Sequence, residues 1–387
     1  MSAASVPHPR RRLRVGIDGR IFSLEQMRGL TRYSVNLARA LAERADVDLV
    51  IICKEAPVES HIRGLDAEVW VLPEGRERTW PTITLPRAIR RARVDVFHAL
   101  ADRGLPFVKV CPLVITIHSS FERAHWRTCF PDLKSRTQYW LDAAAVFLLA
   151  DRVLTVSETT ERELQQLRVA RRRQLRSIHL AAGPEFSPVS PDHDRQVLET
   201  YGLRSPYLVF VGGYDRHKNV ETLVTAFAQL ATPDHQLVLV ADHQWRFEEL
   251  HRAWRELGCF DRLRCIQVHP GDVPALYRNA EVCVVPSLWD SFGLQLVESM
   301  ACGTPVVASE ISTFREVGGD AITTFDPQSP SELAMLLNRV LDDDELRDDL
   351  RERGLRRAAS FSWEHTAAQT VDVYREVAGQ PAGAPTS

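Results

Sequence analysis

Short runs of β-branched and other apolar residues alternate with longer segments of helical periodicity along this chain. The runs lie at 14–18, 49–53, 94–98, 113–118 and 152–156 in the first half, and at 207–211, 236–241, 263–268, 282–285 and directly after 303–305 in the second. Strands that are linked by helices of ten or more residues pair in parallel, and helices then cover both faces of the sheet. The sequence therefore predicts an α/β protein.

The alternation falls into two sets, and a proline-rich stretch that includes Pro184 and Pro188 separates them. A chain of 387 residues suggests two or three domains at about 150 residues each. We predict two Rossmann-like domains at 1–190 and 191–360, a final helical segment at 361–380 and a flexible tail at 381–387. Ligands of such sheets bind beyond the carboxyl ends of the strands, so the functional loops should follow Asp18, His118, Val211 and Val285.

Charge is distributed unevenly between the two sets. Residues 1–190 hold 30 Lys and Arg against 21 Asp and Glu, whereas the remainder holds 18 against 30. The formal net charge of the whole chain is only −3, which makes a uniformly basic nucleic-acid binder improbable. The basic half fits an anionic acceptor or an acidic membrane surface, and a solvated surface of scattered arginines explains the same imbalance equally well.

The cysteines and the longest apolar run indicate the cellular compartment in which the protein is expected. The seven cysteines form no C-x-x-C pair, which argues against a disulfide framework and a structural zinc site and favours a reducing compartment. The longest apolar run, 143–150, is far shorter than the roughly 18 residues that span a bilayer. Asp18 interrupts the apolar stretch behind the N-terminal arginines, so no signal peptide is expected. We expect a cytoplasmic protein, with peripheral contact to the inner face of the membrane as a further option.

The first candidate site follows the strand at 207–211. Gly212 and Gly213 allow a tight turn and a close approach to a ligand, and Arg216 and Lys218 come just before the next helix. Exposed amides with two cations favour a bound phosphate. Lys218 is one of only four lysines, and its compact ammonium is not interchangeable with a guanidinium. The alternative is an ordinary strand–turn–helix connection with solvated cations.

The second candidate site follows the strand at 282–285. Its loop carries Asp290, then Phe292, Gly293 and Leu294 open a helix, and Glu298 lies eight residues after the first carboxylate. Carboxylates accept strong hydrogen bonds from sugar hydroxyls. Unpaired amides at a helix start attract a diphosphate. The alternative is that Glu298 is an ordinary carboxylate on a helix surface.

The stretch 284–308 resembles the signature of the retaining GT-B glycosyltransferases of the mannosyltransferase and glycogen synthase-like group. That signature is a Glu, seven residues and a second Glu, with Phe-Gly after the first and Ala-x-Gly-x-Pro-Val-Val after the second. Further matching segments at 15–20, 28–33, 150–157 and 361–363 follow in the family's order and spread over most of the chain. The resemblance implies a GT-B fold, with an acceptor-binding domain at 1–190 and a donor-binding domain at 191–360 facing across a cleft. It also implies that 361–380 crosses back to the first domain, where Trp363 and Tyr374 are expected to anchor the core.

The resemblance assigns roles to individual residues. Lys218 and Arg216 would neutralise the donor diphosphate, and Glu298 would bind the ribose. Asp290 would bind the hydroxyls of the transferred sugar, and His118 would contact that sugar near the reacting carbon. The catalytic set is thus His118, Asp290, Arg216 and Lys218. The implied donor-binding set consists of Gly29, Gly212, Gly213, Arg216, Lys218, Asp290, Phe292, Gly293, Leu294 and Glu298.

The resemblance further implies a retaining hexosyltransferase of polysaccharide biosynthesis. The expected donor is a nucleotide sugar, with GDP-mannose favoured over UDP- or dTDP-hexoses. The acceptor would be a glycan, a lipid-linked glycan or a small molecule, and nucleic acid is not expected as a partner. No metal and no other cofactor is expected, because side chains and a helix dipole would balance the leaving charge.

Three residues depart from the family pattern. Asp290 is one methylene shorter than the usual Glu, Ser119 replaces the Asp of a common His-Asp pair, and Gly213 stands where an arginine is often found. The missing carboxylate weakens the expectation that His118 is held in one tautomer. Two alternatives therefore stay open: a non-catalytic module that binds nucleotide sugars, and a sugar-nucleotide epimerase on the same scaffold.

Overall fold

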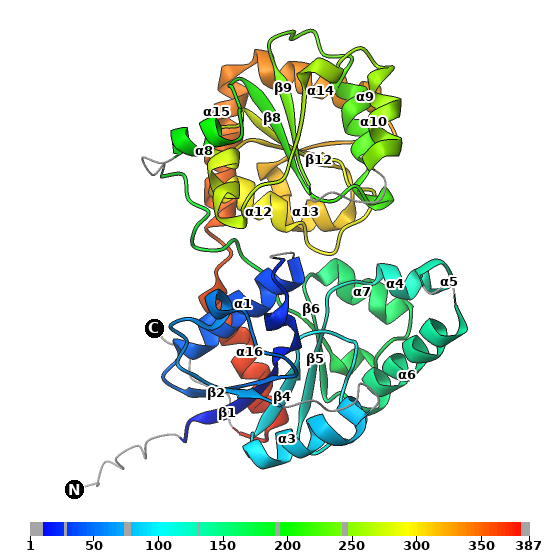
Figure 1. Cartoon of the computed structure of the whole chain (residues 1–387), viewed down its shortest axis with the longest axis vertical. Coiled ribbons are helices and arrows are strands. Elements are labelled where there is room, and N and C mark those ends of the chain that lie inside the picture. Colours follow the sequence, from blue (N-terminus) through cyan, green and yellow to red (C-terminus); the bar gives the residue numbers. More distant parts are fainter. Residues whose placement is uncertain are drawn as a thin grey trace, which may run out of the picture. The chain divides into compact units, whose positions relative to one another are not determined.

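The computed structural model describes residues 11–26, 29–72, 79–129, 132–189, 194–241 and 247–380, and the tail at 381–387 lies outside them (Figure 1). The chain divides into two compact units. The first comprises Met1–Val156, Thr160–Ile178 and Trp363–Ser387, and the second comprises Ser157–Thr159 and His179–Ser362. The boundary predicted after residue 190 therefore falls inside the second unit.

The first unit is built on a sheet of seven parallel strands in the order β3-β2-β1-β4-β5-β6-β7. Its central strands are almost wholly buried and rich in valine, leucine and isoleucine, as expected when helices cover both faces. The strands are β1 Leu13–Asp18, β2 Val47–Cys53, β3 Ala67–Val71, β4 Val96–Ala99, β5 Leu113–Ile117, β6 Arg152–Thr155 and β7 Leu175–Ser177. The helices are α1 Gly29–Ala42, α2 Glu59–Ile62, α3 Leu85–Ala92, α4 Phe121–Ala124, α5 Trp126–Cys129, α6 Leu133–Leu149, α7 Glu158–Gln166 and α16 Trp363–Val377.

Helix α16 belongs to the first unit although it ends the chain, and it packs against α1. Tyr374 on α16 is fully buried, and its hydroxyl lies 2.6 Å from Nδ1 of His98 on β4. Nε2 of His98 lies 2.8 Å from the hydroxyl of Thr116. Burial, with a smaller contribution from His118, lowers the pKa of His98 to about 3, so this imidazole is neutral. Tyr374 is therefore a core anchor as expected, whereas Trp363 is only half-buried.

The second unit contains six parallel strands in the order β10-β9-β8-β11-β12-β13. The strands are β8 Tyr207–Val211, β9 Gln236–Val240, β10 Leu263–Ile266, β11 Val282–Val285, β12 Val306–Ser309 and β13 Thr323–Phe325. The helices are α8 Asp194–Thr200, α9 Val220–Phe227, α10 Phe247–Arg255, α11 Val273–Arg278, α12 Leu294–Ala301, α13 Ser312–Gly318, α14 Pro330–Asp342 and α15 Asp344–Ala358. The core packs helices α9 and α14 against strands β8, β9 and β11.

The α/β class with two Rossmann-like units is confirmed. Every strand that the sequence pattern predicted is present, and the structure adds three, β3, β7 and β13, which all lie at sheet edges. Within the described residues, no helix is both long and apolar enough to cross a bilayer.

Candidate active site

The order of strands in the second unit marks one position for a ligand. From β8 the chain adds β9 and β10 on one side, and it then returns to add β11, β12 and β13 on the other. The carboxyl ends of β8 and β11, which are neighbours, therefore form a topological switch point, where ligands of open α/β sheets bind. The two loops that the sequence singled out, after Val211 and after Val285, both start there.

Backbone and side-chain hydrogen bonds hold these two loops together. The amide of Leu288 donates to the carbonyl of His217 at 2.8 Å. Asn219 has a left-handed backbone conformation with φ at 55°, and its Nδ2 donates to the carbonyls of Pro286 and Pro327 at 3.0 and 2.8 Å. The side chain of Asn219 thus joins the loop after β8 to the loops after β11 and β13.

Lys218 and Asp290 form an ion pair at this junction. The ammonium Nζ lies 2.6 Å from Oδ2 of Asp290, and the side chains are only 17% and 13% exposed. Burial alone would raise the pKa of Asp290, but the Lys218 charge and two backbone amides outweigh it and lower that pKa. Asp290 is therefore ionised at neutral pH, and a carboxylate that accepts from an ammonium forms a strong charge-assisted hydrogen bond.

The amides at the start of α12 are arranged differently from the expectation. Phe292 and Gly293 donate their N–H groups to Oδ1 of Asp290 at 3.3 and 3.0 Å. The expectation that these two amides stand open for a diphosphate is therefore wrong for this structure. The reason is the short side chain: an aspartate readily folds back onto amides two or three residues ahead.

Gly293 is required by its surroundings. Its φ is 82°, and a Cβ at this position would lie 2.7 Å from the Cε1 atom of Phe314, which is fully buried. A larger residue would be strained both by its backbone conformation and by this contact. The bend that starts α12 after Asp290 therefore depends on a glycine.

The remaining residues of the expected donor site in the second unit lie in the loop after β8 and on α12. Arg216 begins the short 3₁₀ turn Arg216–Lys218, and its side chain is exposed. Gly212 donates its amide to the carbonyl of Val240 at 3.0 Å, and Gly213 and then Arg216 follow it in the same loop. Glu298 lies on α12, four residues after Leu294, and is 2% exposed.

The carboxylate of Glu298 is close enough to β11 for its charge to raise the pKa of Cys283 on that strand. Burial raises the pKa of Cys283 to about 12, and the Glu298 charge adds to that rise. Glu298 is therefore not the ordinary surface carboxylate of the alternative interpretation. Its contact with a ribose stays a prediction.

His118 belongs to the first unit, directly after β5. Its Nε2 lies 2.9 Å from the carbonyl of Leu100, and because a carbonyl only accepts, Nε2 carries the proton. The ring of Tyr33 packs edge-on against the imidazole at 4.6 Å between centroids. Burial lowers the pKa of His118, although the Leu100 carbonyl opposes this shift, so the ring is neutral at pH 7. A backbone carbonyl thus fixes the tautomer that the absence of an Asp at Ser119 had put in doubt.

Gly29, the other first-unit residue of the expected donor set, is the first residue of α1 and is exposed. Asn219 was missed as a site residue. Its position directly before a helix is a capping signal, and asparagine tolerates the left-handed conformation, so the pattern could have drawn attention to it.

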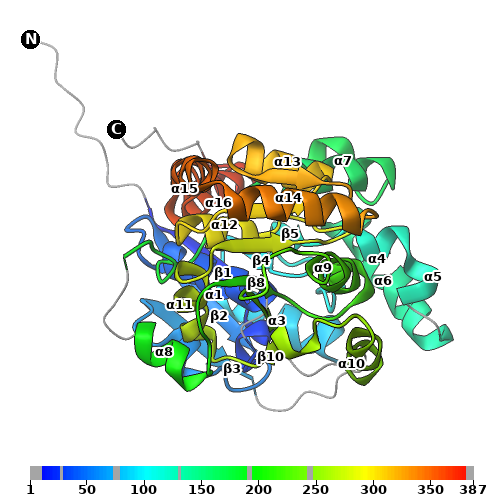
Figure 2. The same cartoon turned by 90° about the horizontal axis from the view of Figure 1, so that it is seen from above.

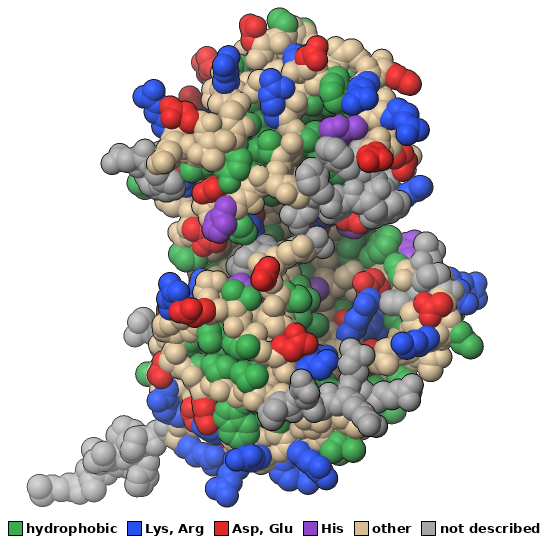
Figure 3. Space-filling view, in the orientation of Figure 1, with side chains coloured by type: hydrophobic (Ala, Val, Ile, Leu, Met, Phe, Trp, Pro, Cys, Tyr) green, Lys and Arg blue, Asp and Glu red, His purple; other side chains and the backbone are tan. Residues whose placement is uncertain are grey.

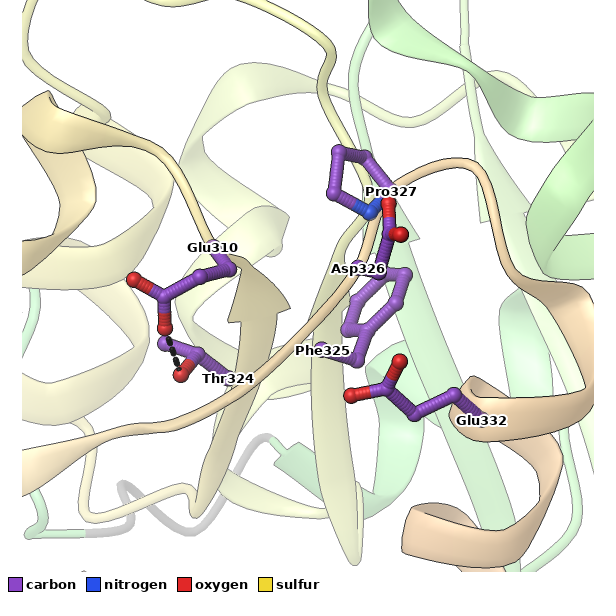
Figure 4. Close-up of a pocket in the computed structure, with 6 residues that line it drawn as sticks. All are labelled: Glu310, Thr324, Phe325, Asp326, Pro327 and Glu332. Carbon is purple, nitrogen blue, oxygen red and sulfur yellow. Dashed lines mark hydrogen bonds between the residues drawn. The ribbon is translucent and has the colours of Figure 1, made fainter.

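A cavity of about 310 Å³ lies in the second unit beyond the ends of β12 and β13 (Figure 4). It is lined by Glu310, Thr324, Phe325, Asp326, Pro327 and Glu332. Glu310 accepts a hydrogen bond from the hydroxyl of Thr324, and Glu332 faces the hollow from α14. Three carboxylates make this cavity unfavourable for a diphosphate, so the junction that holds Lys218 and the exposed Arg216 is the better phosphate site.

Within the described ranges, no group of three or more His, Cys, Asp and Glu side chains could hold a metal ion. In the acidic run at 342–344, Asp342 ends α14, and Asp343 caps α15 by accepting from the amide of Leu346 at 2.9 Å.

Comparisons with known proteins identify the family of this chain. The family described as Glycosyl transferases group 1 matches residues 198–357, and Glycosyltransferase Family 4 matches residues 27–181. The chain belongs to the GT-B glycosyltransferases. The family resemblance that the motif at 284–308 indicated is therefore confirmed, and the two matched segments fall in the two units.

Individual relatives differ in how much they share with this glycosyltransferase. It is 28% identical to O-antigen chain mannosyltransferase B of Escherichia coli over 80% of this chain and 77% of the relative. It is 35% identical to a D-inositol 3-phosphate glycosyltransferase of Salinispora tropica over 50% of this chain, and it spans less than half of that relative, 44%. The structure of Anabaena HepE with UDP and glucose superimposes with a TM-score of 0.77 over 94% of this chain and all of HepE, at 18% identity, which shows a shared fold.

Proposed function

We propose that this glycosyltransferase moves a hexosyl group, with mannose favoured, from a nucleotide sugar to a hydroxyl of a glycan, a lipid-linked glycan or a small molecule, with retention of configuration. The observation that carries the proposal is the Lys218–Asp290 pair at the switch point of the second sheet. Support for the sugar comes from the mannosyltransferase among the relatives, and support for a nucleotide sugar comes from the UDP and glucose in HepE.

The proposed donor site uses both halves of that pair. A diphosphate that reaches the junction would attract the Lys218 ammonium and the exposed Arg216 guanidinium. Asp290 would then accept hydrogen bonds from the sugar hydroxyls, and Glu298 would hold the ribose. The N-terminus of α12, with its partial positive charge, would lie beside the phosphates.

The proposed reaction breaks the bond between the anomeric carbon and the phosphate oxygen of the donor. The acceptor oxygen forms its new bond to that carbon on the same face, and its proton passes to the departing phosphate oxygen. Negative charge grows on the diphosphate as the bond breaks, and Lys218 and Arg216 would stabilise it. Loss of one such preorganised donor typically costs about 10²-fold to 10³-fold in rate.

His118 would act as a neutral hydrogen-bonding group in this scheme. Its Nε2 proton is already used by the Leu100 carbonyl, so its Nδ1 atom is the nitrogen that could accept from a sugar hydroxyl. Two cations of the chain would take the place of a metal ion, and we propose that turnover does not require one.

A ligand screen followed by a transfer assay tests the proposal. A thermal-shift series with GDP-, UDP- and dTDP-sugars should show one donor that raises the melting temperature, because a ligand that binds the native state stabilises it. That donor with a panel of acceptors should give a glycoside of the donor's anomeric configuration by NMR, with equal rates in excess EDTA.

The alternatives give different results in the same assay. An epimerised nucleotide sugar without acceptor would identify an epimerase, and tight binding without turnover on any acceptor would identify a binding module. An inverted product would refute retention, and loss of turnover in EDTA that a divalent cation restores would refute metal independence.

A further inference from the structure

Helix α6 of the first unit presents an apolar face to solvent. Of the fourteen large apolar side chains that are exposed among the described residues, five lie on this one helix. They include Leu133 and Leu148, which are 81% and 72% exposed, and Trp140, which is 52% exposed. Leu141 and Phe147 complete the set, which we term the α6 stripe.

The α6 stripe is one continuous face. At 100° per residue, the five members of the α6 stripe fall within an arc of about 120° on one side of the helix, and the exposed Ala144 lies among them. The opposite side holds the buried residues of α6, which are Asp142, Ala145 and Val146. Since Ala145 and Val146 already pack in the core, the outward apolar side is additional to the face that an ordinary surface helix buries. Seventeen residues give the stripe a length of about 25 Å.

Aromatic rings and cations cluster at the N-terminal end of the stripe. The ring of Trp126 on α5 lies 5.4 Å from that of Trp140 and 6.3 Å from that of Tyr139. The guanidinium groups of Arg127 and Arg136 lie over Trp126 at 5.3 and 5.8 Å from its centroid. Lys134 is exposed in the first turn of α6, beside the capping carboxylate of Asp132.

The C-terminal end of the stripe is also basic. Arg171, Arg172 and Arg173 are all exposed in the segment before β7. The guanidinium of Arg171 lies 5.6 Å from the ring centroid of Phe147, so this basic run adjoins the stripe. Figures 1 and 2 both place α5 and α6 at the periphery of the first unit, where a flat partner could reach them.

We propose that the α6 stripe is a membrane-docking surface that lies flat on a bilayer containing anionic phospholipids. An apolar face about 25 Å long, with tryptophan and phenylalanine among its residues and Lys and Arg at its borders, has the composition of a helix that lies in the membrane interface. Tryptophan and tyrosine rings prefer the headgroup level, and the arginines pair with lipid phosphates there.

A second copy of the chain fits this surface less well. Both ends of the stripe carry an excess of cations, so two stripes that pair in either direction would place cations against cations. An anionic lipid surface complements both ends at once. The docking proposal depends on these contacts alone and does not require the proposed donor chemistry.

Vesicle co-sedimentation tests the proposal with the full chain. Phosphatidylcholine vesicles that contain phosphatidylglycerol should retain the wild-type protein, and pure phosphatidylcholine should retain much less. The double variant Trp140→Ser, Leu148→Ser should bind at least about tenfold more weakly, because it removes two large apolar groups that the bilayer would bury. Both side chains point outward, so the melting temperature should stay close to that of the wild type.

Two controls separate the stripe from other exposed groups. Met335→Ser removes a 68% exposed apolar side chain from α14 and should leave binding unchanged. Replacing Arg171, Arg172 and Arg173 with Gln should weaken binding at least about tenfold. The same replacement of Arg87, Arg90 and Arg91, which are exposed on α3 where basic side chains gather in Figure 3, should have little effect.

Several outcomes would overturn the proposal. Wild-type protein that does not sediment with anionic vesicles contradicts it, and so does a double variant that binds like the wild type. Light scattering could instead show that the wild type is a dimer and the double variant a monomer. Together with an absence of vesicle binding, that result would assign the α6 stripe to contact with a second copy of the chain. Loss of binding only in the α3 variant would place the contact elsewhere.

Discussion

Replacement of Lys218 by Met removes the ammonium and keeps most of the aliphatic stem. The lysine Nζ lies 2.6 Å from Asp290, and the two side chains retain 17% and 13% of their exposure. Removal of one partner of a buried ion pair costs about 3–5 kcal/mol. Some solvent access remains, and Asp290 keeps two hydrogen bonds from amides, so we expect a loss of about 2–4 kcal/mol in the second unit.

The first unit supplies a matched control. Lys109 and Asp151 are also 2.6 Å apart, but their side chains are 38% and 32% exposed. Pairs that are this accessible to solvent contribute about 0–1 kcal/mol. Lys109→Met should therefore lower stability much less than Lys218→Met, although the two pairs have the same length.

A double-mutant cycle with Asp290→Asn measures the pair. The amide oxygen of Asn can still accept from the amides of Phe292 and Gly293, and it leaves no buried charge without a partner. The double variant should therefore be more stable than Lys218→Met, with a coupling energy of at least about 1 kcal/mol. Differential scanning calorimetry of the full chain, with hydrogen exchange to localise the change to the second unit, provides the readout. Equal effects of Lys218→Met and Lys109→Met, or no recovery in the double variant, would refute the reasoning.

The same variant should change the response to acid. The folded-state pKa of Asp290 lies below its ordinary value of 3.8, because Lys218 and the amides outweigh burial. The stability that Asp290 contributes is therefore present above pH 3.8 and is lost as the pH falls through the folded-state value. Without Lys218 this acid-side loss should shrink. The rate of glycosyl transfer should also fall at least about 10²-fold, while Lys109→Met stays near the wild-type rate.

Three further outcomes are expected. Gly293→Ala should cost about 2–4 kcal/mol through its left-handed backbone and its contact with a buried ring, whereas Gly258→Ala, at a similar φ with no atom within 4 Å, should cost about 1 kcal/mol by the same thermal assay. Asn219→Asp should destabilise more than Asn219→Gly, because a carboxylate there would face two carbonyl oxygens; calorimetry that ranks them in the opposite order would contradict this. Burial would raise the pKa of Glu316, but hydrogen bonds, the first of them from His179, lower it to about 2. The stability that Glu316 contributes is therefore present above pH 4.5 and is lost as the pH falls from 4.5 to 2, and Glu316→Gln should remove it. Measurement of the melting temperature across this pH range checks the prediction.

The sequence pattern was sufficient for the central strands and for the edge strand β10, and insufficient for the other three sheet edges. A central strand such as β8 is buried along nearly its whole length and reads as an apolar run. The edge strand β3 is AEVWV and mostly half-exposed, β7 is only three residues long, and β13 begins with two threonines. Edge strands bury one face or less, so they do not produce a continuous apolar signal.

The candidate site was likewise only partly predictable from the sequence. The loop composition after β8 and β11 indicated which residue types would meet, because parallel topology places those loops at one edge of the sheet. It could not indicate that Asp290 would hold Lys218 and two amides at once, since that depends on the bend at Gly293 and on side-chain directions. The Leu100 carbonyl beside His118 was likewise invisible, because a backbone group carries no sequence signal.

The short carboxylate at position 290 bears on how a donor would bind. In this structure one aspartate neutralises the lysine and also accepts from the two amides just before α12, so the junction carries no net positive charge from Lys218. A diphosphate would therefore have to draw Lys218 away from Asp290, and the aspartate would then gain room for a sugar hydroxyl while its amide bonds hold it in place. Removal of the lysine should consequently weaken diphosphate binding, whereas Asp290→Asn should free the ammonium and strengthen the binding of a nucleoside diphosphate that lacks the sugar. Calorimetric titration with the diphosphate of the preferred donor separates the two variants, and weaker binding by Asp290→Asn would show that the pair acts on the phosphates as a unit.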